Sequence, residues 1–178
     1  TSNESKIGAS MNIQHLNELI RVLENVNPID FNLEEWIVTQ EDLEQAIELN
    51  NTPLSRKYQQ LQDPNNCGTV CCAMGWACQD SYFTKNGLTL GTNQMPTHLS
   101  TLYNEQTGKT EKQTTHGFRA IKDFFDFENI QTGEHLFLDS SYEAQDKTTP
   151  EQVIARVRDL IKIGEDKFLK HYEEFYYG

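Results

Sequence analysis

The stretch that decides the fold reads Cys67-Gly68-Thr69-Val70-Cys71-Cys72-Ala73-Met74-Gly75-Trp76-Ala77-Cys78. It contains all four cysteines of the 178-residue chain and one of its two tryptophans, and no charged side chain interrupts it. In a helical projection its apolar groups lie on nearly every side, which is typical of a buried helix. The stretch therefore predicts a central helix over about residues 69–79, with Thr69 as its cap.

Helical periodicity surrounds this stretch on both sides. Apolar residues recur at three- and four-residue steps in residues 13–26, 43–49, 118–127 and 153–161 and in the aromatic C-terminal segment. Three of these segments follow cap signals, which are Asn12, the Thr39-Gln40-Glu41-Asp42 capping box and Thr149-Pro150-Glu151-Gln152. We expect these segments to be helices packed around the central one.

The segment 81–115 has a different character. Gly, Thr and Asn become frequent, the helical period disappears, and Leu88–Leu90 and Leu99–Tyr103 read as short strands. The polar run 106–115 is expected to be an exposed, mobile loop. The predicted fold is therefore mainly α: a compact domain of six or seven helices with a small β-hairpin or loop insertion at about 81–115.

The length favours a single globular domain over residues 11–178. Residues 1–10, which precede Met11, resemble a vector-derived extension, and we expect them to lie outside the domain. No run of about eighteen apolar residues occurs, so the sequence predicts no membrane-spanning segment. We also find no export signal, which predicts a cytoplasmic protein with reduced cysteines.

The net charge of −12 excludes some partners and favours others. Direct nucleic-acid binding needs Lys and Arg on the contact surface, so it is disfavoured. Two stretches contain acidic residues and no basic ones, and such surfaces suit a partner protein with a basic surface. Solvated helical faces are the simpler interpretation. The candidate partner-binding residues are Glu34, Glu35, Glu41, Asp42, Glu44, Glu48, Asp123, Asp126 and Glu128.

The cysteines do not predict a metal site. In the expected helix, Cys71 and Cys78 are separated by roughly 10 Å at 1.5 Å rise per residue. Two thiolates on one zinc ion lie within about 4 Å of each other, so these two cannot share an ion. Buried cysteines acting as small apolar side chains are the better interpretation. We expect neither a metal nor a cofactor.

One cysteine supports a catalytic alternative. Cys67 precedes the expected helix, where the helix N–H groups would lower the pKa of its thiol. The string Asn66–Cys71 resembles the Cys-Gly start of the central helix in papain-like cysteine hydrolases. That resemblance, which covers about ten residues, implies a glutamine in the oxyanion hole and a histidine base. The residues available for these roles are Gln62 or Gln60, and His116 or His98.

A second resemblance is carried by four motifs in a fixed order. They are a Phe-Asn-Leu-x-x-Trp segment (Phe31–Trp36), the Cys-Gly-Thr-Val-x-Cys-x-x-Gly-Trp motif (Cys67–Trp76), Leu136–Leu138 and Thr149–Gln152. Together they resemble a group of small, largely uncharacterised proteins from bacteriophages and bacteria, over about residues 31–161. The resemblance implies a compact helical unit in a phage setting. It implies no known activity.

The leading functional expectation combines the charge with this resemblance. It is a non-enzymatic, phage-type accessory protein that binds and inhibits a host defence or nucleic-acid-binding protein in the host cytoplasm, with nucleic-acid mimicry as one route. The first alternative is the hydrolase with Cys67 as nucleophile. The second is a structural or assembly protein that associates through the aromatic C-terminal helix, which carries Phe168, Leu169, Tyr172, Phe175 and Tyr176.

Overall fold

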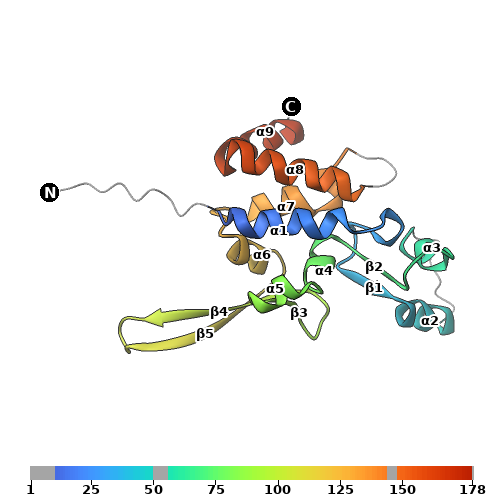
Figure 1. The fold of residues 1–178 in the computed structure, drawn as a ribbon, viewed down its shortest axis with the longest axis horizontal. Coiled ribbons are helices and arrows are strands. Elements are labelled where there is room, and N and C mark those ends of the chain that lie inside the picture. Colours follow the sequence, from blue (N-terminus) through green and yellow to red (C-terminus); the bar gives the residue numbers. More distant parts are fainter. Residues whose placement is uncertain (1–10, 50–55, 144–147, 178) are drawn as a thin grey trace.

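Helices make up most of the described protein (Figure 1). The structure is a computed structural model that describes residues 11–49, 56–143 and 148–177. The expected extension at residues 1–10 lies outside these ranges. The helical elements are α1 (Ile13–Glu24), η1 (Pro28–Asp30), α2 (Gln40–Glu48), α3 (Arg56–Gln62), α4 (Ala73–Ala77), α5 (Ser81–Lys85), α6 (Gly117–Phe125), α7 (Ile130–Phe137), η2 (Asp139–Ser141), α8 (Pro150–Ile163) and α9 (Glu165–Tyr177).

The strands form two antiparallel sheets, which is more β structure than the single predicted hairpin. One sheet pairs two strands and the other has the order β3-β4-β5. The strands are β1 (Ile37–Thr39), β2 (Thr69–Cys71), β3 (Leu88–Leu90), β4 (Pro96–Asn104) and β5 (Lys109–His116). The protein is thus mainly helical with two small sheets.

The main core lies between α1, α4, α6, α7, α8 and α9. In Figure 1, α1, α7, α8 and α9 stack in the upper part of the body, with α6 and α4 beneath α1. The side chains buried most completely in this core include Leu16, Leu19, Phe83, Phe125, Phe137 and Phe168. A second, smaller core joins α2 and α3 to the two-stranded sheet and contains Val38, Leu43, Leu61 and Val70.

The predicted central helix over 69–79 is wrong in its first half. Residues 69–71 form β2, which pairs with β1 in the register Ile37↔Cys71, Val38↔Val70 and Thr39↔Thr69. Cys72 is extended, and its Sγ accepts a hydrogen bond from the backbone N–H of Gly75 at 3.4 Å. Cys72 is therefore the N-cap of a short helix, α4, that ends near Ala77. This strand–cap–helix unit is buried at the centre of the fold, as expected for the stretch.

The predicted insertion at 81–115 is also more structured than expected. Residues 81–85 form α5, the predicted strand Leu88–Leu90 is β3, and the predicted run Leu99–Tyr103 lies within β4. The polar run expected to be a mobile loop is β5, which pairs with β4 from Thr97↔His116 to Asn104↔Lys109. Its polar residues form a strand because β4 supplies a partner along its whole length.

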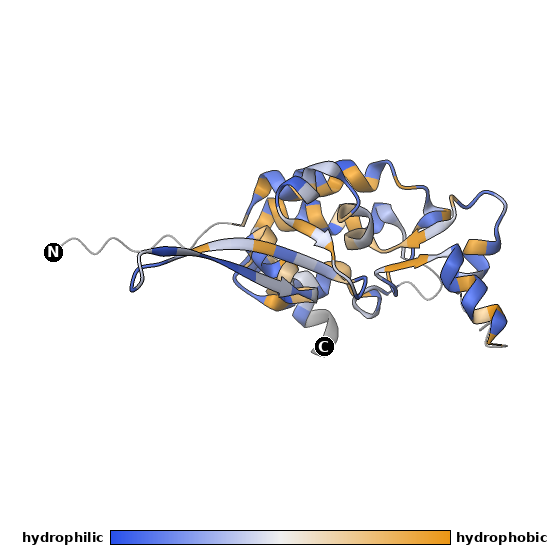
Figure 2. Cartoon of the chain, turned by 90° about the horizontal axis from the view of Figure 1, so that it is seen from below, coloured by the Kyte–Doolittle hydropathy of each residue, from blue (hydrophilic) through white to orange (hydrophobic). Residues whose placement is uncertain are grey.

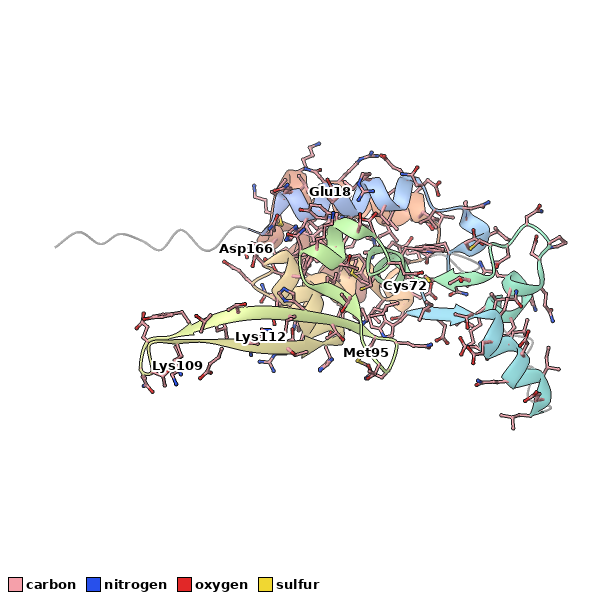
Figure 3. The ribbon with its side chains drawn as sticks, turned by 60° about the horizontal axis from the view of Figure 1, so that its bottom comes forward. Glu18, Cys72, Met95, Lys109, Lys112 and Asp166 are labelled. Carbon is pink, nitrogen blue, oxygen red and sulfur yellow. The ribbon has the colours of Figure 1, made fainter. Side chains whose placement is uncertain are left out.

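The distal parts of β4 and β5 form an arm that projects from the body. Figure 1 shows the arm leaving the body beneath α6, and Figure 2 shows that it is mainly hydrophilic. The arm carries two acidic residues and two basic ones, which are Glu105, Glu111, Lys109 and Lys112. Lys109 lies at the far end of the arm in Figure 3 and Lys112 lies along its length. The arm is thus neutral on a strongly acidic protein.

Three helix starts follow the predicted caps. The side chain of Asn12 accepts from the N–H of His15 at the start of α1. Complete capping boxes begin α2, with Thr39 and Asp42, and α8, with Thr149 and Gln152. Each box satisfies two backbone N–H groups that the helix itself leaves unpaired.

One helix start is capped from a distant part of the chain. The N-cap residue of α7, Asn129, makes no side-chain cap bond. Instead the carboxylate of Glu165, at the start of α9, accepts from the N–H groups of Glu128 and Asn129, both at 2.9 Å, and from Thr132 Oγ1 at 2.6 Å. The carboxylate thus docks α9 on α7 and complements the positive end of that helix.

Candidate functional site

Cys67 lies in the wall of a cleft of about 450 Å³ between α1, η1 and α4. This volume is within the range typical of ligand sites. The cleft is lined by side chains from several segments: Arg21, Val22, Asn25, Val26, Asn27, Asp30, Cys67, Trp76, Gln79 and Asp80. The Cys67 thiol is exposed, whereas the other three cysteines are buried and all four are free.

The surroundings of Cys67 do not activate its thiol. Cys67 is in the loop before β2, so the helix N-terminus that was expected to stabilise a thiolate is absent at this position. Its Sγ donates to the carbonyl of Thr69 at 3.4 Å. Partial burial and the neighbouring carboxylate of Asp30 raise the pKa of the Cys67 thiol. Both influences favour the neutral thiol, which is the poorer nucleophile.

The expected catalytic partners of Cys67 are held elsewhere. Gln60 is buried and fully engaged, because its Nε2 donates to the carbonyls of Phe31 at 2.9 Å and Ile29 at 3.3 Å, and its Oε1 accepts from Asn32. Gln62 is exposed at the end of α3. The described lining of the cleft contains no histidine. The structure therefore does not bring the hydrolase residues together around Cys67.

The two candidate histidines belong to the β3–β5 sheet. His116 is exposed on β5, and its Nδ1 lies 3.3 Å from Thr97 Oγ1. His98 is on β4 and packs edge-on against Phe124. Phe124 also stacks on His15, with 4.2 Å between the ring centroids. His15 Nδ1 hydrogen-bonds the Tyr82 hydroxyl at 2.8 Å, whereas His98 Nδ1 is buried without a described partner.

Acid is expected to destabilise the fold through its partly buried histidines, His15, His98 and His135. Burial lowers the pKa of His15 and of His98, and burial together with the Arg156 guanidinium lowers the pKa of His135. The Asp126 carboxylate raises the pKa of His15, and the Asp123 and Asp126 carboxylates raise that of His98. Burial has the larger effect, so both pKa values remain lowered. Because these folded-state pKa values lie below the unfolded value near 6.5, the unfolded chain binds more protons in mild acid. The free energy of unfolding should therefore be highest above about pH 6.5 and fall as the pH drops below it.

Urea unfolding at about pH 7.5, 6.5 and 5.5 measures this effect, and the carboxylates stay largely ionised over that range. A variant with both His15→Gln and His98→Gln should show a shallower pH dependence than the unmodified protein. A free energy of unfolding that stays constant or rises between about pH 7.5 and 5.5 would contradict the prediction.

The remaining cysteines are structural. Burial raises the pKa of Cys71, Cys72 and Cys78, that of Cys72 to about 12. Gln79 Nε2 donates to Cys71 Sγ at 3.3 Å, and Cys72 caps α4. Among the residues that the structure describes, no group of three or more Cys, His, Asp or Glu side chains is arranged to hold a metal ion.

The candidate acidic residues fall into two separate groups. The first covers α2, at the right of Figure 1, and the segment that leads into β1. Glu34, Glu41, Glu44 and Glu48 are exposed there. Two members are used within the fold, since Glu35 forms an ion pair with Lys57 and Asp42 completes the capping box of α2. The second group, Asp123, Asp126 and Glu128, lies at the C-terminal end of α6 and beyond it.

Sequence reasoning missed the cleft itself. Arg21, Asp30 and Asp80 are far apart in the chain and carry no motif, yet they line one cavity. Trp76 belongs to the stretch expected to form a buried helix, and its indole N–H donates to the carbonyl of Asp30 in the cleft at 3.1 Å. Only the tertiary approach of α1, η1 and α4 creates this site, so no local pattern could indicate it.

In the parts of the chain that the structure describes, no helix combines the length and apolar character needed to cross a bilayer. Comparison with family models, with curated proteins and with solved structures finds no significant match.

Proposed function

We propose that the protein is a non-enzymatic binding protein that uses the exposed face of α2 to engage a partner protein with a basic surface. The observation that carries the proposal is the set of carboxylates on this face. Glu41, Glu44 and Glu48 are spaced three and four residues apart, so they share one side of the helix. No described ion pair involves any of the three.

This arrangement is unfavourable for the isolated helix. Like charges at these spacings destabilise a helix by about 0.2–0.5 kcal/mol per pair. Two large apolar side chains lie beside the carboxylates, and Ile47 is 50% exposed and Leu49 76% exposed. A basic partner surface with apolar patches would relieve the repulsion and cover both side chains.

The finer parts of the proposal rest on the resemblance to phage and bacterial proteins. They are a phage setting, a host defence or nucleic-acid-binding protein as the target, inhibition as the outcome and nucleic-acid mimicry as one route. The alternative assembly role of α9 receives less support, because its described aromatic side chains, Phe168 and Tyr172, are buried in the main core.

Reversing the charges on α2 should abolish partner capture. The variant Glu41→Lys, Glu44→Lys, Glu48→Lys replaces attraction by repulsion, and we expect the amount of basic protein captured from a host lysate to fall about tenfold or more. Capture by the unmodified protein should weaken steeply as salt rises, because exposed charges are screened over about 8–10 Å at physiological ionic strength.

The matched control is Glu105→Lys, Glu111→Lys, Asp166→Lys, which changes the net charge equally at exposed positions away from α2. The control should retain capture. If both variants lose it equally, net charge rather than the α2 face governs binding; if neither loses it, α2 is not the interface. Either result rejects the proposal.

A further inference from the structure

We propose that the cleft beside Cys67 is a binding site for an alkyl guanidinium or ammonium group, with the Asp30 carboxylate as its counter-ion and Trp76 as its apolar wall. This site is separate from the α2 face and does not depend on the function proposed for that face.

Asp30 is a buried acid without a basic partner. It is only 7% exposed, yet no described ion pair includes it. Its Oδ1 accepts from the N–H of Cys67 at 2.9 Å, and its carbonyl accepts from the indole N–H of Trp76. Both of these donors belong to residues of the cleft wall. Carboxylates are rarely buried unless they are paired with a cation.

The one basic side chain of the cleft is already neutralised. Arg21 Nε donates to Glu18, and its Nη2 donates to Asp80 at 2.8 Å. These two acids raise the pKa of Arg21, and Arg21 in turn lowers the pKa of Asp80. With its charge shared between two carboxylates, Arg21 is not available to balance Asp30.

Two of the three amide side chains of the cleft also present acceptors; the third, Asn27, uses its Oδ1 to accept from the N–H of Ile29 at 3.2 Å. Asn25 Nδ2 donates to the carbonyl of Arg21 at 2.8 Å, and Gln79 Nε2 donates to the carbonyl of Gly75 at 3.0 Å. Because their nitrogen atoms are used within the protein, their oxygens are left to accept. A cleft that offers a carboxylate and amide oxygens is complementary to a ligand that is cationic and rich in donors.

The apolar part of the cleft fits the alkyl part of such a ligand. Val22, Val26 and the half-buried indole of Trp76 line it beside the polar groups. A guanidinium or ammonium group on a short aliphatic stem would place its charge at Asp30 and its methylene groups against these side chains. The source of the cation is either a side chain of a protein or a free small molecule.

The test uses the full chain and two probes. These are butylguanidinium and the tripeptide acetyl-Gly-Arg-Gly-amide, with the uncharged citrulline tripeptide as control. The readout is the indole N–H signal of Trp76 in a ¹H–¹⁵N spectrum, distinguished from that of Trp36 by Trp76→Phe. Protection of Cys67 from maleimide gives a second readout, because Cys67 is the one exposed cysteine among the described residues. We expect both cations to shift the signal and to protect the thiol, and the citrulline peptide to do neither.

Two variants should change the affinity for the cation in opposite directions. Asp30→Asn keeps an acceptor for the Cys67 N–H but removes the charge, and should weaken cation binding about tenfold. Arg21→Gln removes the competing cation and frees Asp80, so binding should become tighter. Tighter binding of the tripeptide than of butylguanidinium would assign the cation to a protein side chain, and the reverse order to a small molecule.

The proposal is overturned if neither cation produces a shift at about 10 mM, or if binding is the same in Asp30→Asn. It is also overturned if an anion, butyl phosphate, binds to the cleft in place of the cations and if Arg21→Gln abolishes that binding. The α2 variant Glu41→Lys, Glu44→Lys, Glu48→Lys should bind both probes like the unmodified protein, so failure at the cleft is separable from failure at the α2 face.

Discussion

Gly75→Ala is expected to destabilise the protein by about 4 kcal/mol or more, which would leave little folded protein. A Cβ atom at this position would lie 1.8 Å from the carbonyl oxygen of Trp36, 2.8 Å from Cys71 Cβ and 3.0 Å from the carbonyl carbon of Trp36. Two of these three atoms belong to the backbone, so they cannot move aside as the end of a flexible side chain would.

The clash would separate the elements that meet at the central motif. Residue 36 immediately precedes β1, and Cys71 ends β2, so Gly75 brings α4 against the end of the two-stranded sheet where β1 begins and β2 ends. The backbone N–H of Cys72 also donates to the carbonyl of Glu35 at 2.9 Å, which holds the same two segments together. Adding a methyl group at Gly75 is therefore expected to break hydrogen bonds between these segments as well as their packing contacts.

Gly133→Ala is the matched control, because Gly133 is also a buried helical glycine. There the new Cβ would lie 3.2 Å from a methyl group of Ile121, which can shift slightly. Alanine favours a helix over glycine by about 1 kcal/mol, which offsets this crowding. Urea unfolding should place Gly133→Ala within about 1 kcal/mol of the unmodified protein. Similar losses for the two variants would contradict the steric argument.

The features that sequence predicted well are those with local causes. Asn12, Thr39 and Thr149 cap helices through side chains that reach residues three positions ahead, so the signal lies within a few residues. The buried character of the central stretch likewise follows from its own composition.

The errors arose where a distant segment decides the local structure. Residues 69–71 become a strand because residues 37–39 lie alongside them, about thirty positions earlier in the chain. The polar β5 has no alternating apolar pattern and is a strand only because β4 pairs with it. Strand formation depends on such neighbours more strongly than helix formation does.

The central motif therefore has a structural role for most of its members. Cys71 ends a strand, Cys72 caps α4, and Gly75 permits a close backbone approach. Cys67 and Trp76 differ from these, because they line the cleft rather than the core. Any contribution of the motif to function therefore depends on the cleft and on its buried Asp30, which no local sequence pattern indicates.

Arg156→Ala is expected to cost about 3 kcal/mol, because a single guanidinium joins three elements. Its Nη1 donates to the carbonyl of His135 at 2.7 Å and to Ser141 Oγ at 3.0 Å, and its Nη2 donates to the carbonyl of Ser141 at 2.7 Å. The guanidinium carbon lies 3.5 Å from the ring centroid of Tyr142 and 4.5 Å from that of Tyr172. Arg156 on α8 thus satisfies carbonyls near the end of α7 and in η2, and contacts α9 through Tyr172.

The neighbouring Arg158 provides the control, because it has the same side chain on the same helix. It forms one ion pair with Glu24, and its side chain is 62% exposed, so Arg158→Ala should change the free energy of unfolding by about 0.5 kcal/mol or less. Arg156→Lys should recover less than half of the loss, because an ammonium cannot stack on a ring and reach both carbonyls at once. Urea unfolding of the three variants measures these differences. Equal losses for Arg156→Ala and Arg158→Ala would show that positive charge on α8, rather than the bonds and stacking of one guanidinium, stabilises the fold.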